Sequence, residues 1–121
     1  MSQSSITRHS FDLERRTSEF AKNVIRLCKQ LPQNVINREL IGQLVDASGS
    51  VGANYREAND ALSKKDFRHR IKITRKEAKE GHYWLEFLLE ASPEYKEEIG
   101  KLLTEALELK KIFSSIADKS L

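Results

Sequence analysis

Residues 63–91 carry an apolar stripe at helical spacing, and this feature constrains the fold more than any other. The stripe recurs at intervals of three or four residues and comprises Phe67, Ile71, Thr74, Ala78, Gly81, Leu85 and Leu88. Such spacing is typical of an amphipathic helix with one inward face. Ser63 fits its N-cap, Asp66 stands three residues later, and Ser92-Pro93 ends the helix. The stretch therefore predicts one long helix that packs along a single face.

Helical periodicity continues along the rest of the chain, with no convincing strand. We expect further helices over residues 12–31, 37–59 and 93–119. Pro32 ends the first because it lacks the N–H that would continue the hydrogen-bond ladder, and Asn37 is the expected N-cap of the second. The second is unusually rich in small residues, namely Gly42, Ser48, Gly49, Ser50, Gly52 and Ala53. These predict a close approach between helices, unless Gly49 to Gly52 breaks the helix instead.

Four helices joined by short connections predict an all-α fold, an antiparallel up-down-up-down four-helix bundle. A chain of 121 residues is long enough for one domain with one core. We expect residues 1–10 to be a flexible lead-in and residues 11–121 to form the bundle. The one cysteine, Cys28, excludes an intrachain disulfide framework. With no signal peptide and no apolar stretch long enough for a bilayer, the expected location is cytoplasmic, away from membranes.

Positive charge is concentrated in the third predicted helix. The whole chain has a net charge of +3, but residues 64–79 contain eight lysines and arginines against two acids, a local charge of +6 that leaves −3 for the rest. Most of these cations follow the apolar stripe at helical spacing. We call the following set the basic ridge: Lys64, Lys65, Arg68, Lys72, Arg75, Lys76 and Lys79. From Arg68 to Lys79 it spans about 16 Å, enough to follow several backbone phosphates.

The basic ridge has three interpretations. It binds nucleic acid, RNA or DNA; it docks an acidic protein partner; or it is a solvated face with salt bridges to Glu57, Glu86 or Glu97. Phe67 is the one aromatic residue among the cations, and we expect it in the core. Binding to nucleic acid is therefore predicted to involve the backbone and to weaken with salt, without base stacking.

Signatures of catalysis are weak. A di-iron bundle needs Glu-x-x-His pairs, and neither His69 nor His82 has a glutamate three residues before it. We therefore expect no metal, no cofactor and no enzymatic activity. A carboxylate site from Glu57, Glu77 and Glu80 remains an alternative. Of the aromatic run His82, Tyr83 and Trp84, the tryptophan is expected in the core or in a subunit interface.

Several strings of the sequence resemble a known family. They are Ser50-Val51-Gly52-Ala53-Asn54-Tyr55-Arg56-Glu57-Ala58, then Ser63-Lys64-Lys65-Asp66-Phe67, then Lys76-Glu77-Ala78-Lys79-Glu80 with Tyr83-Trp84-Leu85. In order and spacing they are similar to the four-helix bundle proteins also called 23S rRNA intervening-sequence proteins, over residues 11–120. A related member is the accessory variability determinant of diversity-generating retroelements.

The resemblance implies more than the residues do by themselves. It implies an antiparallel bundle that assembles into a homopentameric barrel with a central channel, and no assigned enzymatic activity. It also implies partners such as nucleic acid, a reverse transcriptase or a ribosome-associated protein. In such a ring, five copies of the basic ridge would add their charge.

Overall fold

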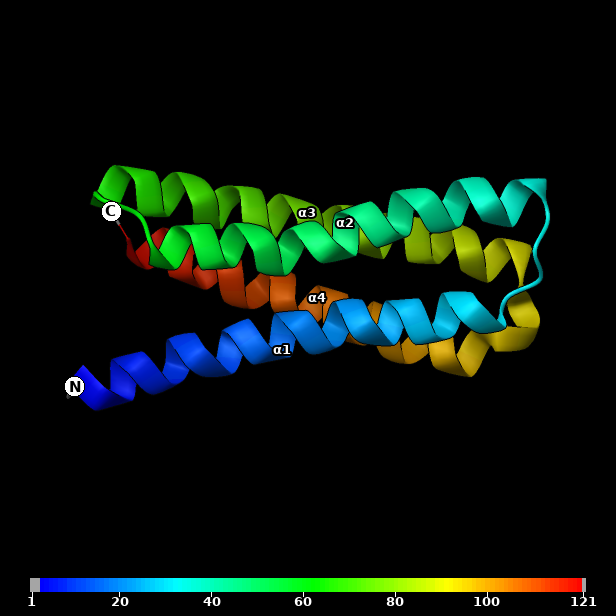
Figure 1. Cartoon of the computed structure of the whole chain (residues 1–121), viewed down its shortest axis with the longest axis horizontal. Coiled ribbons are helices and arrows are strands. Elements are labelled where there is room, and N and C mark those ends of the chain that lie inside the picture. The colour runs from blue at the N-terminus through cyan, green and yellow to red at the C-terminus, as the bar shows by residue number, and fades with distance from the viewer. Residues whose placement is uncertain (1–2, 121) are drawn as a thin grey trace.

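Four long helices form an antiparallel bundle, as predicted. The computed structural model describes the backbone of residues 3–120 and the side chains of residues 12–120. The helices follow one another up and down the long axis (Figure 1). Their bounds are α1 Gln3–Gln30, α2 Val35–Asn59, α3 Lys64–Ala91 and α4 Lys96–Lys119, with a 3₁₀ turn η1 at Pro93–Tyr95 before α4. Among the described residues, no helix joins the length and apolar character needed to cross a membrane.

The core is built from the apolar stripes of all four helices. On α3 every member of the predicted stripe is buried except Phe67, which is half-buried against the core. The largest fully buried side chains are Phe20, Phe113, Leu44, Ile71, Leu85, Leu88, Ile99 and Leu109. Tyr55 meets Phe113 across the core with ring centroids 5.2 Å apart. Cys28 is buried, and this burial raises the pKa of its thiol to about 11, which suppresses the reactive thiolate.

Two of the predicted helix boundaries were wrong. α1 begins at Gln3, inside the stretch expected to be a lead-in, whereas the prediction placed its start at Asp12. Residues 1 and 2 of that lead-in lie outside the described residues, and its flexibility stays a prediction. The predicted start of the fourth helix at Pro93 is the 3₁₀ turn, and the α-helix proper begins at Lys96.

Asn37 is not the N-cap of α2, and the prediction was wrong on this point. Asn34 has the extended backbone of a cap, and its side-chain oxygen accepts a hydrogen bond from the Asn37 backbone N–H at 2.8 Å. Asn37 is instead buried inside the first turn. Its Nδ2 donates to the Pro32 carbonyl at 2.8 Å and lies 3.4 Å from the Ser92 hydroxyl. A buried amide thus ties the α1–α2 loop to the end of α3.

The glycines of α2 lie in two different environments. The helix runs unbroken through Gly49 and Gly52, so the alternative of a break is wrong. A Cβ at Gly52 would lie 3.1 Å from Thr17 Oγ1, so this glycine permits α1 and α2 to approach closely. A Cβ at Gly42 or Gly49 would meet nothing within 4 Å. Close packing inside the bundle therefore explains Gly52 and leaves the other two unexplained.

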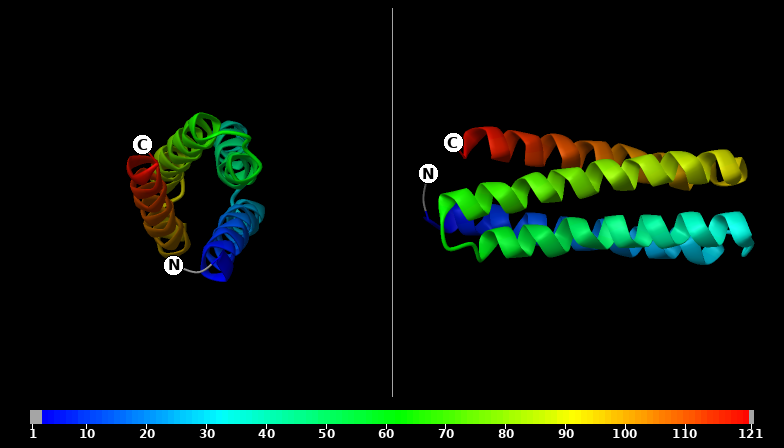
Figure 2. Two further views of the ribbon diagram at one scale, coloured as in Figure 1. Left: turned by 90° about the vertical axis from the view of Figure 1, so that its left-hand side faces the viewer. Right: turned by 90° about the horizontal axis from the view of Figure 1, so that it is seen from above.

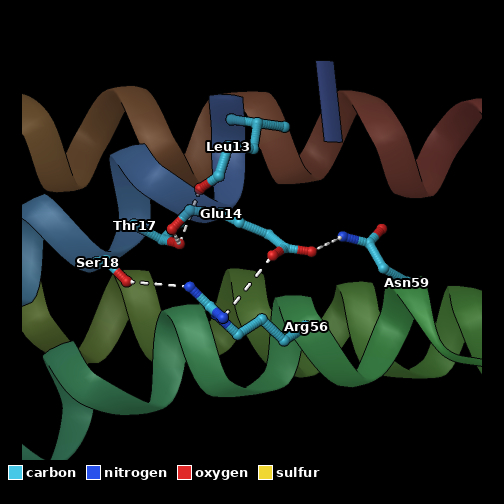
Figure 3. Close-up of polar contacts among 6 residues, drawn as sticks. All are labelled: Leu13, Glu14, Thr17, Ser18, Arg56 and Asn59. Carbon is cyan, nitrogen blue, oxygen red and sulfur yellow. Dashed lines mark hydrogen bonds and ion pairs between the residues drawn. The ribbon is translucent and has the colours of Figure 1, made fainter. Parts of the chain in front are cut away.

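Polar contacts join the first half of α1 to the last turns of α2 (Figure 3). The Glu14 carboxylate accepts a hydrogen bond from Asn59 Nδ2 at 2.9 Å and lies 3.8 Å from the Arg56 guanidinium. Thr17 Oγ1 donates to the carbonyls of its own helix, Leu13 and Glu14, at 2.8 and 3.1 Å. The hydrogen bonds of Thr17 hold the side chain that faces Gly52.

Helix α1 packs less closely against α4 than the helices of the other three adjacent pairs, α1–α2, α2–α3 and α3–α4, pack against each other. Seen along the axis, the ring of four helices is open between α1 and α4 (Figure 2, left). A groove of about 600 Å³ follows this seam, with Phe20 and Leu102 among its lining residues. Arg16 bridges the seam, donating from Nε and Nη2 to the two Glu105 carboxylate oxygens at 2.7 Å each. This bidentate pair is the main polar tie between α1 and α4.

Candidate nucleic-acid interface

The basic ridge lies on α3, as the spacing predicts. Lys64, Lys65, Lys72, Lys76 and Lys79 are exposed, whereas Arg68 and Arg75 are half-buried. Ser63 caps the helix, accepting a hydrogen bond from the Asp66 backbone N–H at 3.1 Å, as expected. The structure thus places all seven cations along one helix, on its outer side and on one flank.

Contacts across the helix flanks show where the ridge faces. Arg68 Nε donates to the Ala117 carbonyl at 3.3 Å, so this flank of α3 lies beside the end of α4. On the opposite flank, Arg70 Nη1 donates to Asn54 Oδ1 of α2 at 3.2 Å. Arg68 also satisfies one of the last carbonyls of α4 and has a structural role besides its charge.

The salt bridges expected of a solvated face do not form. Within the part of the chain that the structure describes, none of the seven ridge cations has a carboxylate within 4.0 Å. Glu86 instead lies 3.1 Å from His82 Nδ1, and neither Glu57 nor Glu97 makes an ion pair with the ridge. The cations of the ridge are therefore not held in close ion pairs with the described carboxylates.

The first two turns of the ridge surround a hollow. It has a volume of about 430 Å³ and is lined by Lys64, Lys65, Arg68, His69, Lys72 and Ser120. No carboxylate side chain is among these residues, and the positive end of the α3 dipole lies beside them. Sequence reasoning did not include His69 in the ridge. Its spacing, four residues after Lys65 and three before Lys72, was the available signal.

The three carboxylates considered for catalysis do not meet. Glu77 lies near Glu80 and near Asp46 of α2, and its pKa is raised by burial and by the charges of these two carboxylates. Glu57 lies near the other end of α3, where it lines a groove with Asp66, His69 and Arg70. No set of three or more potential metal-binding side chains converges among the described residues.

Replacing Glu77 with glutamine should stabilise the protein near neutral pH. The folded-state pKa of this carboxyl lies above its unfolded value, so folding opposes its ionisation, and the penalty applies above the folded pKa. The penalty disappears as the pH falls below about 4, where both states are protonated. Urea unfolding should show a higher midpoint for Glu77→Gln at pH 7 and a smaller difference at pH 4. An equal difference at both values would contradict the electrostatic explanation.

Three aromatic side chains gather on the outer side of the second half of α3. We call Tyr83, Trp84 and Phe87 the aromatic cluster. The ring centroids of Tyr83 and Phe87 are 4.6 Å apart, those of Tyr83 and Trp84 5.0 Å, and those of Trp84 and Phe87 5.5 Å. Tyr83 is 50% exposed and Phe87 is 42% exposed, whereas Trp84 is half-buried against the core. Trp84 is therefore only partly buried within this chain, and Tyr83 and Phe87 are more exposed than Trp84.

Comparison with known proteins agrees with the fold. The sequence matches the 23S rRNA-intervening sequence protein family over residues 10–115. A crystal structure of similar fold is that of a protein of unknown function from the S23 ribosomal protein family of Bacteroides thetaiotaomicron. It shares 30% identity with this chain and superposes with a TM-score of 0.75, covering 86% of this chain and 96% of its own. No curated protein matches the sequence. The chain therefore belongs to the 23S rRNA-intervening sequence protein family.

Proposed function

We propose that this protein is a non-enzymatic, oligomeric helical bundle that binds nucleic acid through the basic ridge. Nucleic acid is the partner that best fits a long, unpaired row of cations, because its backbone presents anions at regular intervals. The observation that carries the proposal is the ridge itself, in which seven cations lie along α3 with no carboxylate of the described residues within 4.0 Å.

Neutralising two ridge lysines should weaken binding and reduce its dependence on salt. Lys72 and Lys79 are both exposed, so Lys72→Gln with Lys79→Gln removes charge without disturbing the core. Each lost phosphate contact lowers the slope of log K against log[salt] by about 1. We expect about tenfold weaker binding of an RNA oligonucleotide at 50–100 mM salt, measured by filter binding.

A matched control removes the same charge from other helices. Lys22 of α1 and Lys111 of α4 are exposed lysines outside the ridge, so Lys22→Gln with Lys111→Gln keeps the net charge equal to that of the ridge variant. If RNA affinity falls equally in both double variants, the net charge of the protein attracts the RNA, and the ridge has no special role. Undetectable binding by the unmodified protein at low salt would refute the proposal outright.

The proposed assembly is a homo-oligomer, with the pentamer favoured. Several apolar side chains of α2 remain exposed on the single chain, namely Val35 at 78%, Ile36 at 66% and Val45 at 36%. Light scattering should give a molar mass near five times the 13.9 kDa of one chain. A monomer would contradict the assembly and remove the gain in avidity from repeated ridges.

An acidic protein is the second candidate partner for the same cations. The exposed ridge lysines would bind an acidic surface on a reverse transcriptase or a ribosome-associated protein by the same charge that attracts a phosphate backbone. A pull-down with and without nuclease distinguishes the two partners. A protein bound directly to the ridge is still captured after nuclease treatment, whereas a protein captured through RNA is lost. The cytoplasmic location and the absence of enzymatic activity stay predictions.

A further inference from the structure

The aromatic cluster continues the line of the ridge along α3. Side chains three or four positions apart share one face of a helix. Lys72, Lys76, Lys79, Tyr83 and Phe87 follow one another at intervals of four, three, four and four residues. The outer face of α3 therefore presents cations over its first half and exposed rings over the next two turns.

The rings of Tyr83 and Phe87 are not needed to fill the core of the bundle. The inward face of the same stretch is completed by Gly81, Leu85 and Leu88, all buried. Tyr83 and Phe87 lie outside that face and contact Trp84 and each other, at interplanar angles of 47–73°. Their mutual contacts hold the rings in place while about half of the Tyr83 surface stays in solvent. Such rings offer flat apolar surfaces beside a row of cations.

We propose that the ligand of this surface is a single-stranded nucleic acid, whose phosphates contact the ridge and whose bases stack on Tyr83 and Phe87. The inference rests on the proposed function and names the ligand class. Bases in a duplex are already stacked and unavailable, whereas those of a single strand are free to stack on aromatic rings. Backbone-only binding was the expectation from sequence, because Phe67 was the one aromatic residue considered beside the cations.

The distribution of charge limits how the strand lies. From Lys72 to Phe87 the surface spans about 22 Å, which suits a strand on the order of four nucleotides. Acidic side chains begin among the rings, where Glu86 is paired to His82, and Glu90 is exposed beyond them. Phosphates are therefore held on the Lys79 side, and one or two bases extend over the rings where the basic ridge ends.

Trp84 provides a built-in reporter for the test. It is the one tryptophan of the chain, and its ring centroid lies 5.0 Å from that of Tyr83. The full chain would be titrated with a single-stranded oligonucleotide, with the duplex of the same sequence and with inorganic polyphosphate, which carries charge without bases. We expect the single strand to bind about tenfold more tightly than the duplex or polyphosphate, and to change the Trp84 fluorescence.

Variants of Tyr83 separate stacking from charge. Tyr83→Ala should weaken single-strand binding about tenfold while polyphosphate affinity stays within about twofold, and Tyr83→Phe should retain the single-strand affinity. An unchanged far-UV circular dichroism spectrum and thermal unfolding midpoint show that Tyr83→Ala is folded. Leu107→Ala is the control, since Leu107 is a 38% exposed apolar side chain of α4; it should leave all affinities unchanged.

Each contrary result has a distinct meaning. Equal binding of single strand and polyphosphate, unaffected by Tyr83→Ala, refutes stacking and leaves binding by the ridge intact. Failure of all three ligands to bind refutes the proposed function together with this inference. If Tyr83→Ala lowers the molar mass in light scattering and leaves single-strand affinity unchanged, the rings form a contact between copies of the chain, and the inference is wrong.

Discussion

Replacing Phe20 with alanine is expected to lower the free energy of unfolding by about 3–5 kcal/mol. Phe20 is 1% exposed and is the largest fully buried side chain that α1 contributes. Its ring reaches across to α3, where a Cβ on Gly81 would lie 3.8 Å from the ring. Because Gly81 has no side chain, it cannot fill the cavity left by the ring. Urea unfolding followed by circular dichroism measures the loss.

Ile25→Ala is the matched control for this experiment. Ile25 lies on the same helix but is 47% exposed, so its truncation should cost less than about 1 kcal/mol. Both variants must be compared at one protein concentration, because an oligomer gains stability by mass action. Losses of similar size for Phe20→Ala and Ile25→Ala would mean that α1 is held by surfaces other than the core that the structure assigns to it.

The periodic apolar stripes made the fold predictable from sequence. Phe20, Ile71 and Leu109 stand at core positions in the structure because a helix buries the residues that recur every three or four positions. The cap at Ser63 was also predictable, since the donor it satisfies lies three residues away. Both features depend on neighbours close in sequence, which the sequence itself specifies.

Features decided by distant neighbours were not predictable in the same way. Asn34 and Asn37 are both residue types that favour a cap. The Asn37 amide is buried between the Pro32 carbonyl and Ser92, 55 positions away, and Asn34 caps α2. The interface shows the same limit. The seven ridge cations were identified by spacing. The same spacing places Tyr83 and Phe87 outside the apolar stripe, but the extent to which neighbouring side chains leave each ring exposed comes from the structure.

Gly52→Val is expected to lower the free energy of unfolding by about 2–3 kcal/mol, through overpacking between α1 and α2. The first atom of any side chain at this position would lie 3.1 Å from Thr17 Oγ1. Thr17 is 0% exposed, and its hydroxyl hydrogen-bonds two carbonyls of its own helix, so it cannot easily move aside. Gly49→Val makes the same chemical change on the same helix, but into open space. It should change the free energy of unfolding by less than about 0.5 kcal/mol.

A double-mutant cycle locates the cause of the loss. In Gly52→Ala the gain in helix propensity, about 1 kcal/mol, opposes the close contact with Thr17 Oγ1. Thr17→Ala removes that oxygen and leaves the Thr17 Cβ at 3.5 Å, an ordinary contact distance. The alanine at position 52 should therefore stabilise the Thr17→Ala background more than the unmodified protein, with a coupling energy of about 0.5–3 kcal/mol. Zero coupling would mean that the contact with Thr17 is not the cause of the loss in stability. A loss from Gly49→Val as large as that from Gly52→Val would mean that α2 is packed closely on its other face, against another copy of the chain.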